Sequence, residues 1–456
     1  MATHRLDIKR FNALAAHARS PAAAYISREL AWFANDSETL LATLMLDTED
    51  DDFVGIILGR DEAGRFRCID CMAGIPTQDE AAAWIDRAMA WHGRDGQATF
   101  SQGDETKQPK PLDLFTPVVA AEKLHPSFAK LCQSKAFLPA RRQIAEIMPH
   151  YVDVDGNFVE QFQTTGFDAR LWELYLHSYL VEEQLFLDRE HSRPDFLVKK
   201  YGKSVAIEAT IVGRRADKPV SYFKTELSLP EDHEEVRRRH EHEIPIRFGS
   251  PLFTKLQKRY WELDHIKGLP LVFAIADFHD DQSMMWTSTA LINYLYGVRH
   301  DFHFDDDKQL VITPLKIETH KVGNKEIPSG FFFQPDAQHV SAVLSSASGT
   351  ISKFNRLGRQ AGFKAPGLVM LRMGTYHDHD PNAHLPKSFE YIVDEKAQET
   401  WAEGLSMFHN PNALHPVPEE LFPTIAHHRF RDGQIVSALP EFHPYASLTV
   451  NMIGKA

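Results

Sequence analysis

Three acidic residues stand out because each lies in or beside a predominantly apolar stretch of the sequence. Glu173 lies among the large apolar residues of segment 170–188, Asp195 directly precedes Phe-Leu-Val, and Glu208 follows Val-Ala-Ile. A carboxylate in such surroundings is costly unless it is paired, hydrogen-bonded or bound to a metal. Carboxylate oxygens are also the ligands that hard cations such as Mg²⁺ prefer. These residue types therefore point to a cation site as one use of the three acids.

A helix and a hairpin are the elements that must position these acids. Segment 170–188 carries apolar side chains on nearly every face through its first three turns, which is typical of a helix buried on most sides. The runs PDFLV and SVAIEATIV, separated by KKYGK, predict two antiparallel strands. Because side chains alternate along a strand, Glu208 and Thr210 project from the same face. Asp195 and Glu208, on adjacent strands, could then converge on one ion.

The segments that follow predict further helices and strands. Ser250, with Pro251 at the first helical position, predicts a helix over PLFTKLQKRYWELDHI. The run LPLVFAIADF predicts a buried strand, residues 287–296 predict a helix, and VSAVLSS predicts another strand. The order from residue 165 to 296 is therefore helix, strand, strand, helix, strand, helix.

This order of elements resembles that of the PD-(D/E)XK nuclease superfamily, which has the restriction-endonuclease-like fold. The resemblance rests on Glu173 in the leading helix, Pro194-Asp195 at the start of a strand, and Glu208-Ala209-Thr210 in the next strand. It covers residues 165–296, under a third of the chain. It implies an α/β fold with a central mixed sheet flanked by helices, and hydrolysis of phosphodiester bonds. DNA is preferred over RNA as the substrate only by analogy with the family.

The resemblance also implies a role for each acid. Asp195 and Glu208 would hold Mg²⁺, for which Mn²⁺ could substitute, with the backbone carbonyl of Ala209 as a third ligand. Glu173 would assist as an outer ligand or through water. Phosphodiester hydrolysis needs a nucleophilic water near neutral pH and a counter-charge for the pentavalent phosphorane, and a hard divalent cation supplies both.

The sequence departs from the family pattern at Thr210, where the family normally has a lysine. A threonine hydroxyl cannot supply a positive charge. Lys255, in the following helix, is a candidate for a migrated lysine, and Gln257 in the same helix could contact the attacking water or a phosphate oxygen. The alternative for Lys255 is an ordinary exposed helix lysine.

Other interpretations of these residues stay open. The substitution at Thr210 favours a catalytically inactive nuclease fold that binds nucleic acid or a protein partner. A glycoside hydrolase with two carboxylates about 5 to 10 Å apart is a further alternative. Glu173 could be a structural acid paired with an arginine such as Arg193, and Asp195 could be a turn residue after proline.

The chain length indicates more than one domain. With 456 residues it exceeds an ordinary single domain. We expect an N-terminal α/β domain of unassigned role over 1–120, a nuclease-like core with insertions over 135–370, and a C-terminal extension packed on the core over 371–456. Within the first unit, FVGIILGRDEAGRFRCIDC predicts a hairpin, and Thr77 with Glu80 forms a capping box before the next helix.

Charge and cysteine usage narrow the class of protein. The net charge of −13 argues against a protein that coats nucleic acid with its whole surface. Window 193–259 nevertheless holds 15 Lys and Arg against 10 Asp and Glu, which suits a local phosphate contact or a solvated helix face. Three cysteines indicate a reduced compartment, and Cys68 and Cys71 are expected to be small buried residues rather than zinc ligands.

The remaining signals concern location and partners. The chain shows no secretory signal and no membrane-spanning run, so we expect a cytoplasmic protein without membrane contact. The expected partner is nucleic acid, and a homodimer stays open. The string His377 to Asp380, with His384 beyond, has metal-capable side chains, but adjacent residues of a polar loop rarely converge on one ion.

Overall fold

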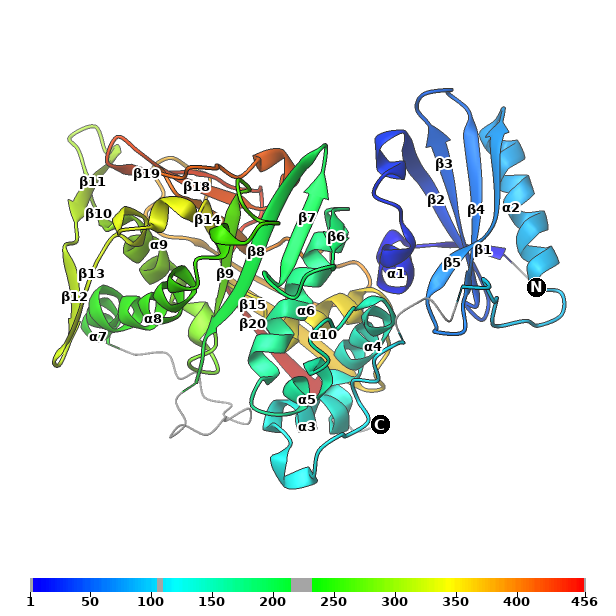
Figure 1. Cartoon of the computed structure of the whole chain (residues 1–456), viewed down its shortest axis with the longest axis horizontal. Coiled ribbons are helices and arrows are strands. Elements are labelled where there is room, and N and C mark those ends of the chain that lie inside the picture. The colour runs from blue at the N-terminus through cyan, green and yellow to red at the C-terminus, as the bar shows by residue number, and fades with distance from the viewer. Residues whose placement is uncertain (1–2, 105–109, 215–231, 455–456) are drawn as a thin grey trace.

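The structure is a computed structural model that describes residues 3–104, 110–214 and 232–454 (Figure 1). It is a mixed α/β protein with a five-stranded sheet near the N-terminus, a central eight-stranded sheet, a three-stranded sheet and two isolated hairpins. The α/β class is thereby confirmed. Within the described ranges, no helix combines the length and the apolar character needed to cross a bilayer.

The N-terminal sheet is antiparallel, with its strands in chain order. Helix α2 (Gln78–Gly93) covers one face, and α1 (Ile8–Ala15) lies on the other, between the sheet and the rest of the molecule (Figure 1). The predicted hairpin and the cap are confirmed, since the Thr77 hydroxyl accepts the Glu80 N–H at 3.3 Å. The strands are β1 (Thr3–Leu6), β2 (Ser27–Asn35), β3 (Leu40–Asp47), β4 (Phe53–Arg60) and β5 (Phe66–Ile75).

The expected burial of two cysteines was wrong. Cys68 and Cys71 are exposed, and both are free thiols. They lie on β5, which is an edge strand with β4 as its one neighbour and with register shifts along the pair. Edge position and irregular pairing leave part of such a strand uncovered by the core.

The central sheet is mixed and lies between two layers of helices. Its order is β19-β18-β17-β14-β9-β8-β7-β6, in which β6, β7 and β8 form an antiparallel meander and β9 and β14 run parallel to β8. The strands are β6 (Phe186–Asp188), β7 (Phe196–Lys200), β8 (Lys203–Val212), β9 (Leu271–Asp277), β14 (Ala342–Ser346), β17 (Leu405–His409), β18 (Ala426–Arg431) and β19 (Gln434–Ala438).

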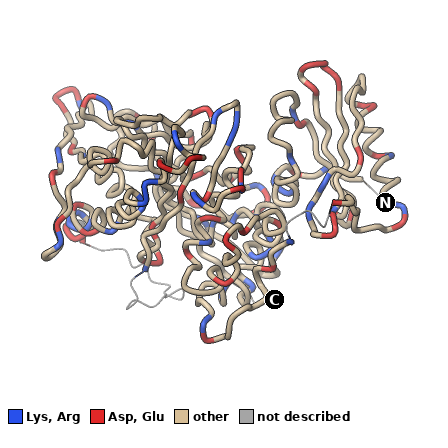
Figure 2. Tube along the Cα trace, in the orientation of Figure 1, with Lys and Arg blue, Asp and Glu red and all other residues tan. Residues whose placement is uncertain are grey.

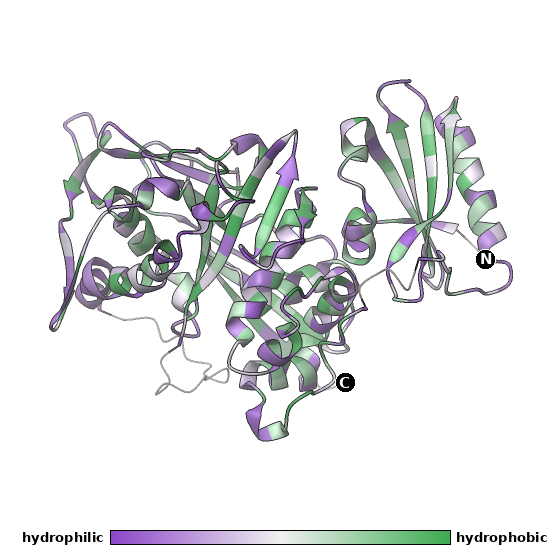
Figure 3. Ribbon diagram, in the orientation of Figure 1, coloured by the Kyte–Doolittle hydropathy of each residue, from purple (hydrophilic) through white to green (hydrophobic). Residues whose placement is uncertain are grey.

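Side chains of β8 alternate between two hydrophobic cores. Ile207 packs into the core that also contains α6, whereas Ala206 packs into the core of α8 and α9. Apolar residues accordingly concentrate on the central strands and the helices against them, while α7 is mostly hydrophilic (Figure 3). The first layer holds α3 (Pro126–Gln133), α4 (Leu138–Ile147), α5 (Phe158–Gln163), α6 (Phe167–Glu182) and α10 (Ile351–Gln360), and the second holds α7 (His233–Arg238), α8 (Ile244–Gln257) and α9 (Ser288–Tyr296).

Most elements predicted around the acids are confirmed, with two corrections. The hairpin β7–β8, strands β9 and β14, and helices α6 and α9 are present as predicted. Residues 186–188, however, form a strand, because α6 ends at Glu182 and Gln184 adopts a left-handed φ of 54°. The predicted helix over 251–266 was also wrong at both ends: α8 begins at Ile244, carries Pro251 in its interior and ends at Gln257.

The early start of α8 has a physical reason. A π-helical turn (Arg239–Glu243) leads directly into α8, so the chain is already helical before Ser250. Phe248 and Leu252 are buried on either side of Pro251. Their packing offsets the backbone hydrogen bond that proline removes.

The C-terminal region completes the central sheet as well as covering it. Strands β17, β18 and β19 extend the sheet beyond β14. Strands β16 (Lys387–Ile392), β15 (Leu368–Tyr376) and β20 (Pro444–Ile453) form a separate three-stranded sheet. The remaining hairpins are β10–β11 (Val298–Phe304, Leu310–Lys316) and β12–β13 (Thr319–Val322, Lys325–Pro328).

Candidate carboxylate site

The hairpin brings Asp195 and Glu208 to neighbouring positions. Phe196 pairs with Ile207 across the two antiparallel strands, so continuing this register by one residue places Asp195 opposite Glu208. The Asp195 carboxylate accepts the backbone N–H of Ala209 at 2.7 Å. Asp195 is therefore fixed at the point where β7 begins, beyond which β8 continues with β9 as its neighbouring strand.

Glu208 is buried on β8 and contacts two side chains from the neighbouring helical layer. Its Oε1 accepts the Tyr260 hydroxyl at 2.6 Å and forms an ion pair with the Lys255 ammonium. The side chains of Lys255 and Glu208 are 17% and 6% exposed. Lys255 is thus directed at the carboxylate rather than into solvent, and it supplies a positive charge on the face where Thr210 has none.

Glu173 reaches the site from α6. Its carboxylate pairs with Arg170, one turn earlier in the helix, at 2.6 Å. The arginine is therefore Arg170 and not Arg193, whose side chain is exposed. Burial raises the pKa of Glu173, the charges of Arg170 and Arg189 oppose that rise, and repulsion from Glu208 adds to it.

Mutual repulsion ties the three carboxylates into one electrostatic site. Burial, followed by the negative charges of Glu208 and Glu173, raises the pKa of Asp195 to about 8, and the Ala209 N–H and Lys255 only partly oppose this. Strongly perturbed acids that interact in this way are typical of functional sites. The structure therefore brings together all three acids selected from the sequence.

The oxygens that stay unused suit a hard cation. Within the described ranges, one oxygen of each carboxylate, Glu173 Oε1, Asp195 Oδ1 and Glu208 Oε2, has no hydrogen-bond partner. The Ala206 N–H donates to the Pro270 carbonyl on the β9 side. The backbone N–H and C=O groups of the odd-numbered residues of β8 therefore point toward β7. Continued two residues past its last pair, the same register brings Ala209 level with Pro194. Proline has no N–H, so it cannot donate a hydrogen bond to the Ala209 carbonyl.

The donor set thus fits Mg²⁺, although the side chains are not arranged around one point. Carboxylate and carbonyl oxygens are the ligands this ion takes, and it needs few from the protein because it keeps several waters. No three His, Cys, Asp or Glu side chains of the described residues form a ready metal cage. A bound ion would have to compete with Lys255 for Glu208.

Several residues of the site were not identified from the sequence. Tyr260 binds Glu208, and Arg189 holds Asp195 in place by donating to its backbone oxygen at 2.7 Å and to that of Val152 at 2.7 Å. An arginine in a short polar turn carries no signal of this role. Tyr260 offered a weak signal, because it is an aromatic residue with a hydroxyl just past the end of an amphipathic helix.

Gln257 points away from Glu208, and its contact with the attacking water or a phosphate oxygen stays a prediction. Its side chain is exposed at the end of α8. Two residues along a helix correspond to a rotation of about 200°, so Lys255 and Gln257 cannot face the same strand. Thr210 is half-buried on the face of β8 that also carries Glu208.

In the part of the chain that the structure describes, the other charged and histidine-rich segments form no group of three metal-binding side chains. Acidic and basic residues are interspersed along the trace (Figure 2). Part of the basic window, residues 215–231, lies outside the described residues. In the histidine string, His377 contacts the Tyr445 hydroxyl at 2.7 Å and Asp378 pairs with Lys387 at 2.8 Å.

Comparison with known proteins gives no independent evidence on the role of this site. No protein-family model, no curated protein and no solved structure matches the chain. The physical arrangement of the residues is therefore the basis for any functional conclusion.

The Asp195→Asn variant is expected to be more stable than the wild type in EDTA above pH 4. The folded protein keeps the Asp195 proton up to pH 8, whereas the unfolded chain loses it near the ordinary value, so wild-type stability falls as pH rises through this window. The gain should grow from pH 4 to pH 8 and reach on the order of 2 kcal/mol. Denaturant unfolding at several pH values measures it.

Asp188 supplies the matched control. The Lys199 side chain lowers the pKa of Asp188, so Asp188→Asn should lose a little stability above pH 4 instead of gaining it. Equal shifts of the same sign in both variants would contradict the electrostatic account of Asp195.

Proposed function

We propose that this chain is a divalent-cation-dependent nuclease with Asp195 and Glu208 at its active centre. The observation that carries the proposal is a set of three mutually repelling carboxylates, of which Glu208 is buried and Glu173 and Asp195 are half-buried, with an adjacent lysine and free oxygens. Folded proteins rarely keep such repulsion unless a ligand relieves it. The element order α6-β6-β7-β8-α7-α8-β9, in which α7 leads into α8 through the π-helical turn, supports a restriction-endonuclease-like core.

Each residue has a separate task in this proposal. Asp195, Glu208 and the Ala209 carbonyl would hold Mg²⁺, which when bound supplies a counter-charge to the phosphate and lowers the pKa of a water molecule. Glu173 would hold a proton or a water at the edge of the cluster. Lys255 would move from Glu208 to a phosphate oxygen or to the attacking water, and Arg189 positions Asp195. DNA is the substrate we propose, by analogy with the family.

One observation favours a second candidate, an inactive nuclease fold that binds nucleic acid or a protein partner. Glu208 already has a cation, Lys255, and a hydroxyl donor, Tyr260. If that pair is permanent, no divalent ion can enter. The two candidates therefore differ in whether Mg²⁺ or Mn²⁺ stabilises the protein.

The test is a cleavage assay combined with thermal unfolding. The wild type is incubated with single-stranded, double-stranded and branched DNA and with RNA, in Mg²⁺, Mn²⁺ or EDTA, beside the Asp195→Ala protein purified identically. We expect cation-dependent cleavage by the wild type alone, and a cation-dependent rise in its melting temperature. Equal cleavage by both proteins, or no cleavage and no thermal response, would refute the proposal.

Lys255→Met is expected to lower turnover about 100-fold while preserving cation binding. The variant keeps the apolar stem of the side chain and removes the charge that Thr210 cannot supply. Removing the competing ammonium should leave the cation-induced rise in melting temperature intact or larger. Lys267→Met, at an exposed lysine, is the control. Unchanged turnover in Lys255→Met would assign Lys255 a structural role.

A further inference from the structure

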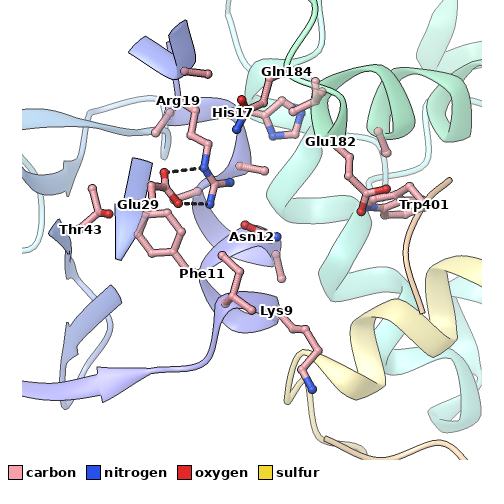
Figure 4. A pocket seen from close by; sticks show the side chains of 18 of the residues that line it. Lys9, Phe11, Asn12, His17, Arg19, Glu29, Thr43, Glu182, Gln184 and Trp401 are labelled. Atoms are coloured by element: carbon pink, nitrogen blue, oxygen red, sulfur yellow. Dashed lines mark hydrogen bonds and ion pairs between the residues drawn. The ribbon is translucent and has the colours of Figure 1, made fainter. Parts of the chain in front are cut away.

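A cavity of about 730 Å³ lies between the N-terminal sheet and the core, apart from the carboxylate site (Figure 4). Its N-terminal wall comes from α1, the 3₁₀ turn Ala16–Ala18 and strands β2 and β3. Its other wall comes from α6 and segment 398–401. In Figure 4, Thr43 and Glu29 lie on one side, and Glu182 and Trp401 lie on the other.

Most charged groups on this wall already have partners. Arg19 and Glu29 form a two-point ion pair, with both hydrogen bonds at 2.7 Å. Lys9 donates to the backbone oxygen of Ala397 at 3.1 Å. Glu399 is paired with Lys353 and Arg356, which lie outside the lining. Glu182 accepts the Ala402 N–H at 3.0 Å. Arg28, the remaining charged residue of the lining, is exposed to solvent. The charged groups of the wall thus already have partners or solvent, so an uncharged ligand suits it.

Two residues of the lining, Asn12 and Thr43, each carry a buried polar atom that has no hydrogen-bond partner among the described residues. In Thr43, which is 4% exposed, this atom is the hydroxyl oxygen, and in Asn12 it is Oδ1. A buried polar atom that forms no hydrogen bond costs about 1–3 kcal/mol. Both atoms can accept a hydrogen bond, and rotation of either side chain would bring its oxygen to the cavity side, where a ligand with N–H or O–H donors would remove this cost.

The rest of the wall is largely apolar and made of small side chains. Alanines of α1 and the turns after it occupy much of the N-terminal side, which keeps the space open. Larger apolar groups complete the wall, namely Phe11, Met45, Leu58, Val181 and Trp401. Pockets of about 300–1,000 Å³ with apolar walls and a few polar groups are typical of small-molecule sites.

We propose that this cavity binds an uncharged, largely apolar small molecule that donates hydrogen bonds to Asn12 and Thr43. The ligand would contact both the N-terminal sheet and the core, so its binding stabilises their association. This inference does not depend on the nuclease proposal, since none of Glu173, Asp195 and Glu208 lines the cavity.

The first experiment tests the class of ligand with a nearly isosteric pair. The full chain is titrated with 1-naphthamide, which is neutral and carries N–H donors, and with 1-naphthoate, which is an anion. Binding is followed by calorimetry and by thermal unfolding. We expect naphthamide to bind at least about tenfold more tightly, because the wall, whose charged groups already have partners or solvent, cannot compensate a buried carboxylate. Equal binding of the two probes, or no binding of naphthamide at its solubility limit, would overturn the proposal.

The second experiment locates the binding. Thr43→Val should weaken naphthamide binding about fivefold, which corresponds to one hydrogen bond, while the stability of the free protein is unchanged or higher. Ala16→Leu should abolish binding by filling the cavity. Ala83→Leu, on an exposed position of α2, is the control and should bind normally. Unchanged affinity in both Thr43→Val and Ala16→Leu would refute this location and the proposal with it.

Discussion

Cleavage by the Glu208→Gln variant is expected to fall about 10³-fold or more below the wild type, a loss of about 4 kcal/mol of transition-state stabilisation. Glutamine keeps nearly the same shape and can still accept the Tyr260 hydroxyl. It cannot hold a divalent cation as a carboxylate does, nor attract Lys255 by charge. The substitution therefore removes the charge of the site and retains most of its packing.

Two measurements separate this loss from damage to the fold. The melting temperature of Glu208→Gln in EDTA should stay close to that of the wild type, because loss of the Lys255 ion pair is offset by relief of the repulsion from Asp195 and Glu173, while its response to Mg²⁺ or Mn²⁺ disappears. Glu420→Gln is the matched control, because Glu420 is an exposed glutamate that also pairs with a lysine, Lys203. Its cleavage rate should be unchanged. A Glu208→Gln protein that cleaves at the wild-type rate would exclude Glu208 from the chemistry.

The pairing of Asp195 with Glu208 could be predicted because it depends on local rules. A two-strand hairpin with a glycine-containing turn has a definite register, and the alternation of side chains determines which of them project together. The apolar character of 170–188 likewise predicted a buried helix with Glu173 inside it. These inferences need no knowledge of distant contacts, and the structure reproduces them.

The environment of Glu208 was harder to predict because it depends on where α8 begins and on how α8 is rotated about its axis. The Ser-Pro signal at 250 and 251 suggested a helix start, but tertiary packing extends the helix back to Ile244. The rotation of a helix decides which residue faces the sheet, so Lys255 and Gln257 point in different directions. Arg170 follows a short-range pattern, because it pairs with Glu173 three residues along the same helix. Tyr260 reaches Glu208 from beyond the end of α8, through a contact that no short-range pattern encodes.

The cavity between the two units illustrates a further limit of sequence reasoning. Its walls combine α1 and β3 with α6 and segment 398–401, which are far apart along the chain. The polar residues Asn12 and Thr43 look like ordinary helix and strand positions in the sequence. Their lack of partners is visible only once all neighbouring elements are placed.

A buried ionic cluster connects α10, β15 and segment 399–403. Glu399 accepts two hydrogen bonds from Arg356, both at 2.7 Å, and pairs with Lys353 at 2.9 Å and with Arg372 at 3.5 Å. Glu403 pairs with Arg372 at 2.6 Å. Three basic groups thus share two carboxylates, and Glu399 contacts all three. Its side chain is 1% exposed, so water cannot replace it.

Glu399→Gln is therefore expected to lower the free energy of unfolding by about 3–5 kcal/mol, the usual cost of removing one partner from a buried ion pair. Denaturant unfolding followed by tryptophan fluorescence measures it, and Trp401 lies two residues away. Glu419→Gln is the control. Glu419 also pairs with an arginine, Arg429, but its side chain is 47% exposed, so the loss should stay below about 1 kcal/mol.

The pH dependence of this loss has a definite sign. Burial alone would raise the pKa of Glu399, but the charges of Arg356, Lys353 and Arg372 outweigh it and hold the pKa well below the ordinary value. A group with a lowered folded pKa adds stability above its unfolded pKa and loses that contribution as pH falls toward the folded value. The difference between wild type and Glu399→Gln should therefore be constant from pH 5 to pH 8 and narrow below pH 4. A difference that is equally large at pH 3, or equal losses in the two variants at pH 7, would show that the cluster acts through shape and not through charge.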